Sequence, residues 1–112
     1  MQNKVLVVDI DGTICTTEGS DYPNSQPIHQ RISSLNLLSE EGYIIIFLTA
    51  RGMGSSNNNA AQAEAKWRKL TEDQLVKWGV KYQQLFFGKP AGDAYIDDKG
   101  INDEDFFSQK MV

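Results

Sequence analysis

Two continuous apolar stretches, each ending in a polar cluster, constrain the fold of this chain more than any other feature. The first covers residues 4–8 and the second covers residues 43–48. Short runs rich in valine and isoleucine, without alternating polar residues, are typical of strands buried on both faces of a parallel sheet. We therefore predict two such strands.

The residues between these strands predict a helix. Pro27 suits the first turn of a helix, and apolar residues follow at spacings of four, three and three: Ile28, Ile32, Leu35 and Leu38. Gly42 suits the end of this helix. A strand, a helix and a strand in this order form a right-handed crossover between parallel strands. The polar clusters after the two strands then lie at the same carboxyl edge, where open α/β sheets bind ligands.

The second half of the chain predicts further helices and strands. Its predicted elements are a flexible polar loop at 52–59, helices at 60–70 and 71–78, and strands at 80–87 and 94–96. The break between the two helices rests on a capping-box pattern that begins at Thr71. Together these elements predict a single α/β domain over residues 1–112.

Composition narrows the class of protein. A content of 40% hydrophobic and 23% charged residues is that of a globular protein, and no apolar run approaches the roughly 20 residues of a membrane span. Cys15 is the single cysteine and cannot form an internal disulfide, so we expect a cytoplasmic protein. The net charge of −4 gives the molecule no general attraction for polyanions such as nucleic acid.

Two pairs of acidic residues follow predicted strands. Asp9 and Asp11 come directly after the first strand, and Asp97 and Asp98 come after the last one. The first pair alone could equally be a turn with a helix cap. Carboxylates that converge from two strand ends repel each other unless a cation lies between them, and oxygen ligands of this kind suit Mg²⁺. The two pairs together predict a magnesium site.

Three residues between the acidic pairs are candidates for binding an anion. Thr49 ends the second strand and Lys89 lies in a turn after the third, so each has an ordinary structural explanation as a cap or a surface residue. Their order between the acidic pairs favours a role in phosphate binding. For Arg51 two alternatives stay open: a solvent-exposed residue at the start of a loop, or a second phosphate or substrate contact.

These residues resemble the four motifs of phosphatases of the haloacid dehalogenase-like (HAD) superfamily. The match covers residues 7–13, residues 48–51, Lys89 and residues 95–98, in that order along nearly the whole chain. The resemblance implies a HAD-like, Rossmann-like three-layer sandwich with a short, mostly parallel sheet and no cap domain.

The resemblance also implies a mechanism. Asp9 would attack phosphorus and form an aspartyl-phosphate, and Asp11 would act as general acid and then as general base. Mg²⁺ would be held by Asp9, the backbone carbonyl of Asp11 and the last acidic pair. In that pair, Asp98 would contact the ion directly, and Asp97 would support Asp98 without contacting the ion. The remaining candidates, Thr49 and Lys89, would bind the phosphoryl oxygens.

The resemblance extends to a substrate class. The stretches that carry caps in this superfamily are short here, so the open site suits a bulky or polymeric substrate unless a neighbouring subunit covers it. The motif spacing is similar to capsule- and polysaccharide-biosynthesis phosphatases and to the phosphatase half of polynucleotide kinases. The acidic net charge favours a sugar phosphate or related phosphorylated metabolite over a nucleic-acid 3′-phosphate.

A receiver-like regulatory domain and a phosphomutase are two alternatives to a phosphatase. A receiver-like regulatory domain would bind Mg²⁺ and phosphate and keep Asp9 phosphorylated, but a general base at Asp11 argues against a long-lived aspartyl-phosphate. A phosphomutase must exclude water, which an uncapped site does poorly.

Overall fold

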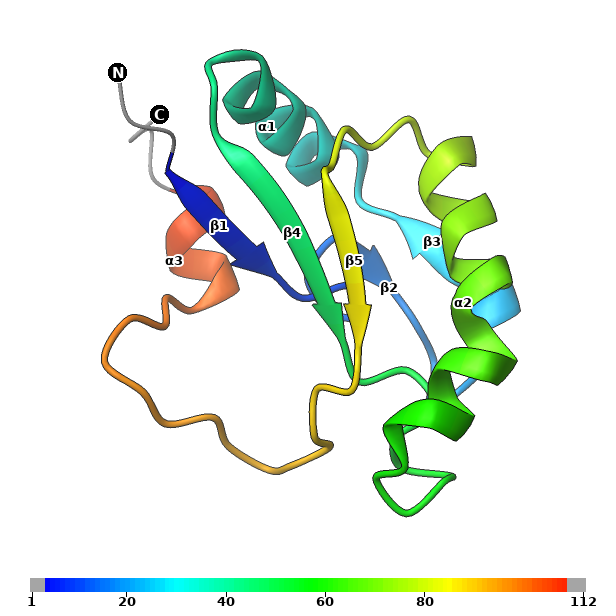
Figure 1. Ribbon diagram of the computed structural model, residues 1–112. Coiled ribbons are helices and arrows are strands. Elements are labelled where there is room, and N and C mark those ends of the chain that lie inside the picture. The colour runs from blue at the N-terminus through cyan, green and yellow to red at the C-terminus, as the bar shows by residue number, and fades with distance from the viewer. Residues whose placement is uncertain (1–3, 109–112) are drawn as a thin grey trace.

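A three-stranded parallel sheet forms the centre of the molecule. The structure is a computed structural model that describes residues 4–108, and the sheet order is β1-β4-β5. Its strands are β1 (Val5–Val8), β4 (Ile44–Thr49) and β5 (Gln84–Phe87), which lie side by side and point the same way in Figure 1. The two predicted apolar strands and the parallel sheet are confirmed, whereas the third strand is shorter than predicted.

Helices α1 (His29–Glu40) and α2 (Ala60–Lys77) cover the sheet, and the short α3 (Asp103–Ser108) follows near the end of the chain. The predicted break at the start of residues 71–78 is wrong, because α2 runs through it as one helix of 18 residues. Thr71 is fully buried inside this helix and does not cap a new one. None of the helices in residues 4–108 has the length and apolar character needed to cross a membrane.

The short segment between β1 and α1 contains regular secondary structure. A two-stranded antiparallel pair, β2 (Cys15–Thr16) and β3 (Gln26–Pro27), flanks a short 3-10 helix η1 (Tyr22–Asn24). Pro27 therefore lies in a strand and not in the first turn of α1. Two features hold Pro27 in this extended segment. Ile14 is completely buried, and its carbonyl accepts a hydrogen bond from the amide of Ile28 at 2.8 Å.

The hydrophobic core lies on one face of the sheet. On β4, Ile45 and Phe47 are completely buried, while their neighbours on the strand are only half-buried. The core also takes in apolar side chains of both long helices, of the turn after β1 and of β5: Ile10, Ile14, Ile32, Leu35, Leu38, Leu75 and Leu85. Helix α2 lies beside β5 in Figure 1, and Phe106 and Phe107 of α3 also pack against this core.

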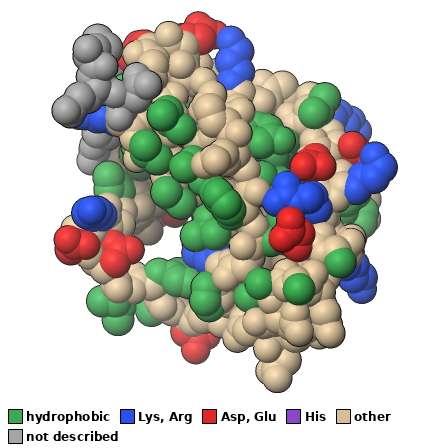
Figure 2. All heavy atoms as spheres, viewed as in Figure 1, with side chains coloured by type: hydrophobic (Ala, Val, Ile, Leu, Met, Phe, Trp, Pro, Cys, Tyr) green, Lys and Arg blue, Asp and Glu red, His purple; other side chains and the backbone are tan. Residues whose placement is uncertain are grey.

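The opposite face of the sheet is apolar and largely uncovered. Val5, Val7 and Phe86 are 52%, 62% and 48% exposed, and apolar side chains gather over the sheet in Figure 2. The predicted burial of both faces is therefore wrong for β1. The α/β fold, the parallel sheet flanked by helices and the lack of a cap domain hold for residues 4–108.

The predicted fourth strand at 94–96 is not formed. Ile96 is 95% exposed, and residues 90–102 run outside the sheet in an irregular path, visible below β1 in Figure 1. The side chain of Asp97 accepts hydrogen bonds from the amides of Lys99 and Gly100 at 2.7 and 2.6 Å. These local bonds fix a turn directly after residues 94–96 and compete with sheet pairing.

The one-sided core predicts an asymmetric response to mutation. Ile45→Ala should lower the free energy of unfolding by roughly 2–5 kcal/mol, because it empties a completely buried position. The matched control Val7→Ala, on the exposed face of the same sheet, should change it by no more than about 0.5 kcal/mol. Urea denaturation measures both, and equal losses would mean that the second face is covered in solution.

Candidate active site

The two polar clusters meet in a pocket at the carboxyl edge of the sheet. The pocket measures about 230 Å³ and is lined by residues that follow β1, β4 and β5 and by two residues between β2 and β3: Asp9, Asp11, Gly19, Tyr22, Ala50, Arg51, Lys89 and Tyr95. The predicted convergence of the strand ends is therefore confirmed. Ligand pockets commonly span roughly 300–1,000 Å³, so this one has room for a small group such as a phosphoryl group.

Asp9 lies at the base of this pocket, directly after β1. The hydroxyl of Thr13 donates a hydrogen bond to one of its carboxylate oxygens at 3.1 Å, and the ammonium of Lys89 lies 3.6 Å from the other. Burial raises the pKa of the Asp9 carboxyl above its ordinary value, and the charge of Lys89 opposes that shift. Asp9 is thus a partly desolvated carboxylate with a cation beside it, as suits a nucleophile that approaches an anion.

Asp11 forms a two-pronged ion pair with Arg51. The Nε of Arg51 lies 3.0 Å from Oδ2 of Asp11, and its Nη2 lies 3.0 Å from Oδ1. The hydroxyl of Thr17 donates a further hydrogen bond to Oδ1 at 2.6 Å. The side chain of Arg51 is completely buried, whereas that of Asp11 is 25% exposed and faces the pocket. The carboxylate of Asp11 is therefore held in one orientation at the pocket wall.

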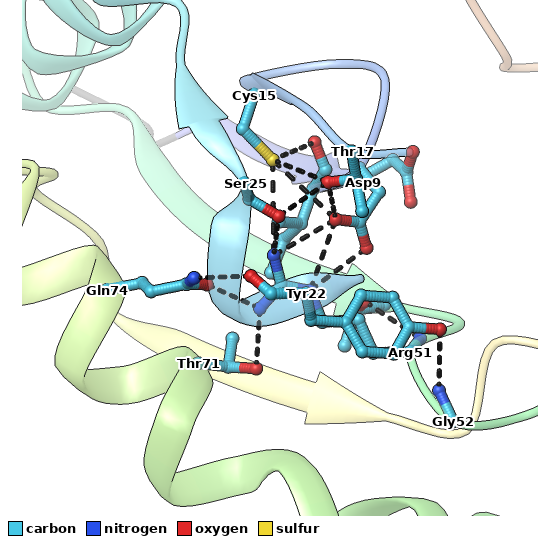
Figure 3. A network of polar contacts seen from close by, with 12 residues as sticks. Asp9, Cys15, Thr17, Tyr22, Ser25, Arg51, Gly52, Thr71 and Gln74 are labelled. Atoms are coloured by element: carbon cyan, nitrogen blue, oxygen red, sulfur yellow. Dashed lines mark hydrogen bonds and ion pairs between the residues drawn. The ribbon is translucent and has the colours of Figure 1, made fainter. Parts of the chain in front are cut away.

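The rest of the Arg51 guanidinium binds other parts of the protein. Its Nη1 donates to Thr71 at 3.0 Å and to Gln74 at 2.6 Å, both on α2, and its Nη2 lies 3.4 Å from the hydroxyl oxygen of Ser25. Figure 3 shows these groups around the guanidinium, with Tyr22 beside it. The solvent-exposed alternative for Arg51 is wrong, because the residue is 1% exposed. Contact between Arg51 and a phosphate stays an untested prediction.

Sequence patterns did not single out the residues that hold Arg51. The sequence predicts only a capping box that begins at Thr71, and it predicts no role for Ser25. Each contact joins segments far apart in the chain, so no local spacing indicates it. The one available signal was the polar character of Thr71 and Gln74, three residues apart on a helix, which places both on one face.

Thr49 and Lys89 lie at different depths. Thr49 is completely buried beneath the pocket, and its hydroxyl accepts a hydrogen bond from the backbone amide of Arg51 at 3.1 Å. Lys89 lines the pocket, and its ammonium lies 4.2 Å from the centre of the Tyr95 ring. Lys89 therefore lies beside Asp9, whereas the side chain of Thr49 is buried and does not line the pocket. The predicted contacts of both residues with phosphate stay predictions.

Asp97 and Asp98 do not reach the pocket in this structure. Both are exposed on the irregular segment at 90–102, and residues 4–108 contain no group of three or more His, Cys, Asp or Glu side chains close enough to hold a metal ion. The two pocket carboxylates, Asp9 and Asp11, already face Lys89 and Arg51. As they are arranged here, the pocket residues alone do not fit a magnesium site.

Comparison with known proteins identifies the fold and one relative. No protein-family model and no curated protein sequence matches the chain. Two chains solved as a Pnkp1/Rnl/Hen1 complex and a Pnkp1/Rnl/Hen1 RNA repair complex match 97% of this chain and 34% and 32% of their own lengths. Their TM-scores are 0.58 and 0.57 at 22% and 18% identity, so they share the fold alone.

A much more similar structure is that of a structural-genomics target from Vibrio cholerae. It superposes with a TM-score of 0.89 and is 31% identical, and the match covers 96% of this chain and 90% of that chain. The match therefore includes the sheet, the helices and the segments that line the pocket. This chain has a HAD-like α/β fold and belongs to the same family as the Vibrio cholerae protein.

Proposed function

We propose that the protein is a phosphomonoester hydrolase that reacts through an aspartyl-phosphate on Asp9. The observation that carries this proposal is the pairing of charges in one pocket: Asp9 with Lys89, and Asp11 with Arg51. One carboxylate is placed to act as a nucleophile and the second to move a proton. The HAD-like fold supports the same reaction class.

The first step transfers the phosphoryl group to the protein. A carboxylate oxygen of Asp9 forms a bond to phosphorus while the bond from phosphorus to the leaving oxygen breaks, and Asp11, which enters this step protonated, gives its proton to that oxygen. Lys89 lies 3.6 Å from Asp9 and lowers the repulsion between this carboxylate and the approaching anion. The alcohol leaves through the open side of the pocket.

The second step releases phosphate. Asp11 takes a proton from a water molecule, whose oxygen forms a bond to phosphorus while the bond to Asp9 breaks. Asp9 is regenerated as a carboxylate and Asp11 is again protonated. The same residue thus serves as acid and base, which requires its carboxyl group to stay in place through both steps.

We propose a sugar phosphate or related phosphorylated metabolite as the substrate class. A pocket of about 230 Å³ accommodates the phosphoryl group, and residues 4–108 provide no cap to enclose what is attached to it. The attached group therefore lies outside the pocket, which also suits a bulky or polymeric substrate. A polynucleotide 3′-phosphate is the second candidate, favoured by the shared fold with chains of an RNA repair complex.

Replacement of Asp9 should abolish activity. Wild-type protein should release p-nitrophenol from p-nitrophenyl phosphate in the presence of Mg²⁺, and Asp9→Asn should lose at least about 10³-fold in kcat because no nucleophile remains. The same assay with phosphorylated sugars and 3′-phosphorylated oligonucleotides ranks the two substrate classes. Undiminished turnover by Asp9→Asn would rule out the assigned nucleophile. Phosphorylation of Asp9 without turnover would favour a receiver-like domain.

The stability of the variant provides its control. Because burial raises the pKa of Asp9 above 3.8, folding is opposed by the ionised carboxylate at pH values above the folded pKa. Asp9→Asn should therefore be at least as stable as the wild type near neutral pH, and any gain should vanish below the ordinary pKa, where both states are protonated. Urea denaturation at both pH values separates lost chemistry from lost folding.

We further propose Mg²⁺ as the cofactor, held by Asp9, the backbone carbonyl of Asp11 and the last acidic pair, with Asp98 in direct contact and Asp97 supporting Asp98. When bound, the ion would offset charge on the phosphoryl group. Since Asp97 and Asp98 lie on the exposed segment at 90–102, metal binding requires this segment to move toward Asp9 so that Asp98 contacts the ion.

Magnesium affinity tests this arrangement directly. Titration calorimetry should show Mg²⁺ binding to the wild type, and Asp98→Asn should weaken it more than Asp97→Asn, because Asp98 is assigned the direct contact. Asp93→Asn is the matched control, since Asp93 is an exposed acid on the same segment. Equal affinity in all four proteins would exclude the last acidic pair as ligands.

A further inference from the structure

We infer that Arg51 is a positioning residue for Asp11, held in place by α2. This inference rests on the proposed phosphohydrolase activity and assigns to Arg51 a role other than phosphate contact. The side chain of Arg51 is completely buried, whereas that of its partner Asp11 is 25% exposed at the pocket. Arg51 would thus act on the reaction only through Asp11.

The donors of Arg51 are fully used within the protein. A guanidinium carries five N–H groups in a fixed plane. The Nε group points to Asp11, the two on Nη1 point to Thr71 and Gln74, and the two on Nη2 point to Asp11 and Ser25. A phosphate in the pocket would have to displace one of these acceptors before it could bind Arg51. The geometry therefore favours a protein acceptor, and not a phosphate, for each N–H group of Arg51.

The acceptors on α2 are themselves held. The amide nitrogen of Gln74 donates a hydrogen bond to the backbone carbonyl of Tyr22 at 2.7 Å, which fixes the direction of its oxygen toward Arg51. The ring of Tyr22 lies 5.0 Å from the guanidinium and stacks edge-on against Trp67 of α2, and its hydroxyl accepts a hydrogen bond from the amide of Gly52 at 3.1 Å. Figure 3 shows Gln74, Thr71 and Tyr22 around the buried guanidinium. Its position is therefore fixed from several sides.

A fixed Arg51 matters because Asp11 must serve two steps. General acid–base catalysis requires the carboxyl oxygen within hydrogen-bond distance of the transferred proton, and a displacement of about 1 Å can cost roughly 100-fold in rate. Lysine has no planar pair of donors and cannot hold both oxygens of Asp11 together with Thr71 and Gln74. Arg51→Lys keeps the charge and removes this geometry.

A double-mutant cycle tests whether Arg51 acts through Asp11. The rate of p-nitrophenyl phosphate hydrolysis is measured for the wild type, Arg51→Lys, Asp11→Asn and the double variant. In the wild-type background, Arg51→Lys should lower kcat by about 10- to 100-fold with KM within about twofold. In the Asp11→Asn background it should have almost no further effect, because the group that it positions is gone.

Two controls keep the outcome decisive. Arg68→Lys is the matched substitution, since Arg68 lies on α2 away from the pocket and pairs with Glu64 and Glu72, and it should leave kcat unchanged. Should Arg51→Lys fail to fold, as judged by circular dichroism, Thr71→Val replaces it in the cycle. Thr71→Val removes one acceptor of Arg51 and should give a smaller loss that is likewise absent in the Asp11→Asn background.

The possible results separate the inference from the proposed function. An inactive wild type would overturn the phosphohydrolase itself. An active wild type in which Arg51→Lys has no effect, or reduces the rate equally with and without Asp11, would overturn the positioning role alone. A rise in KM at constant kcat would instead assign Arg51 to binding of the phosphoryl group.

Discussion

The ion pair between Arg51 and Asp11 joins the segments that follow β1 and β4 to α2 beside the pocket. Asp11 follows β1, Arg51 follows β4, and the same guanidinium binds α2 through Thr71 and Gln74 and approaches Ser25 beside β3. Removal of one partner from a buried ion pair costs about 3–5 kcal/mol, because a charge remains without compensation. The pair therefore links the geometry of the site to the packing of α2 on the sheet.

The parallel sheet could be predicted from the sequence because its signal is local. An apolar run, a helix of regular periodicity and a second apolar run leave few alternative topologies, and both strands formed where that pattern lies. Exposure could not be predicted in the same way. Val7 and Ile45 have similar apolar neighbours in sequence, yet Val7 is 62% exposed and Ile45 is buried, because helices cover one face only.

The site was predictable where its residues directly follow strands. Asp9, Asp11 and Lys89 converge because parallel strands end at a common edge, a constraint that needs no knowledge of side-chain packing. The burial of Arg51 depends instead on contacts with Thr71 and Gln74, which lie 20 and 23 residues away along the chain. The position of Asp98 depended on a strand that local hydrogen bonds of Asp97 replace with a turn.

The central claim is that Asp9 accepts the phosphoryl group, and chemical identification of the phosphorylated residue tests it most directly. Asp11→Asn retains the nucleophile and lacks the base that releases phosphate, so it should accumulate the intermediate with p-nitrophenyl phosphate. Acid quenching and borohydride reduction convert an aspartyl-phosphate to homoserine, which peptide mass spectrometry locates. The account predicts this product at position 9. Modification of another residue, or hydrolysis by the wild type with position 9 never modified, would contradict it.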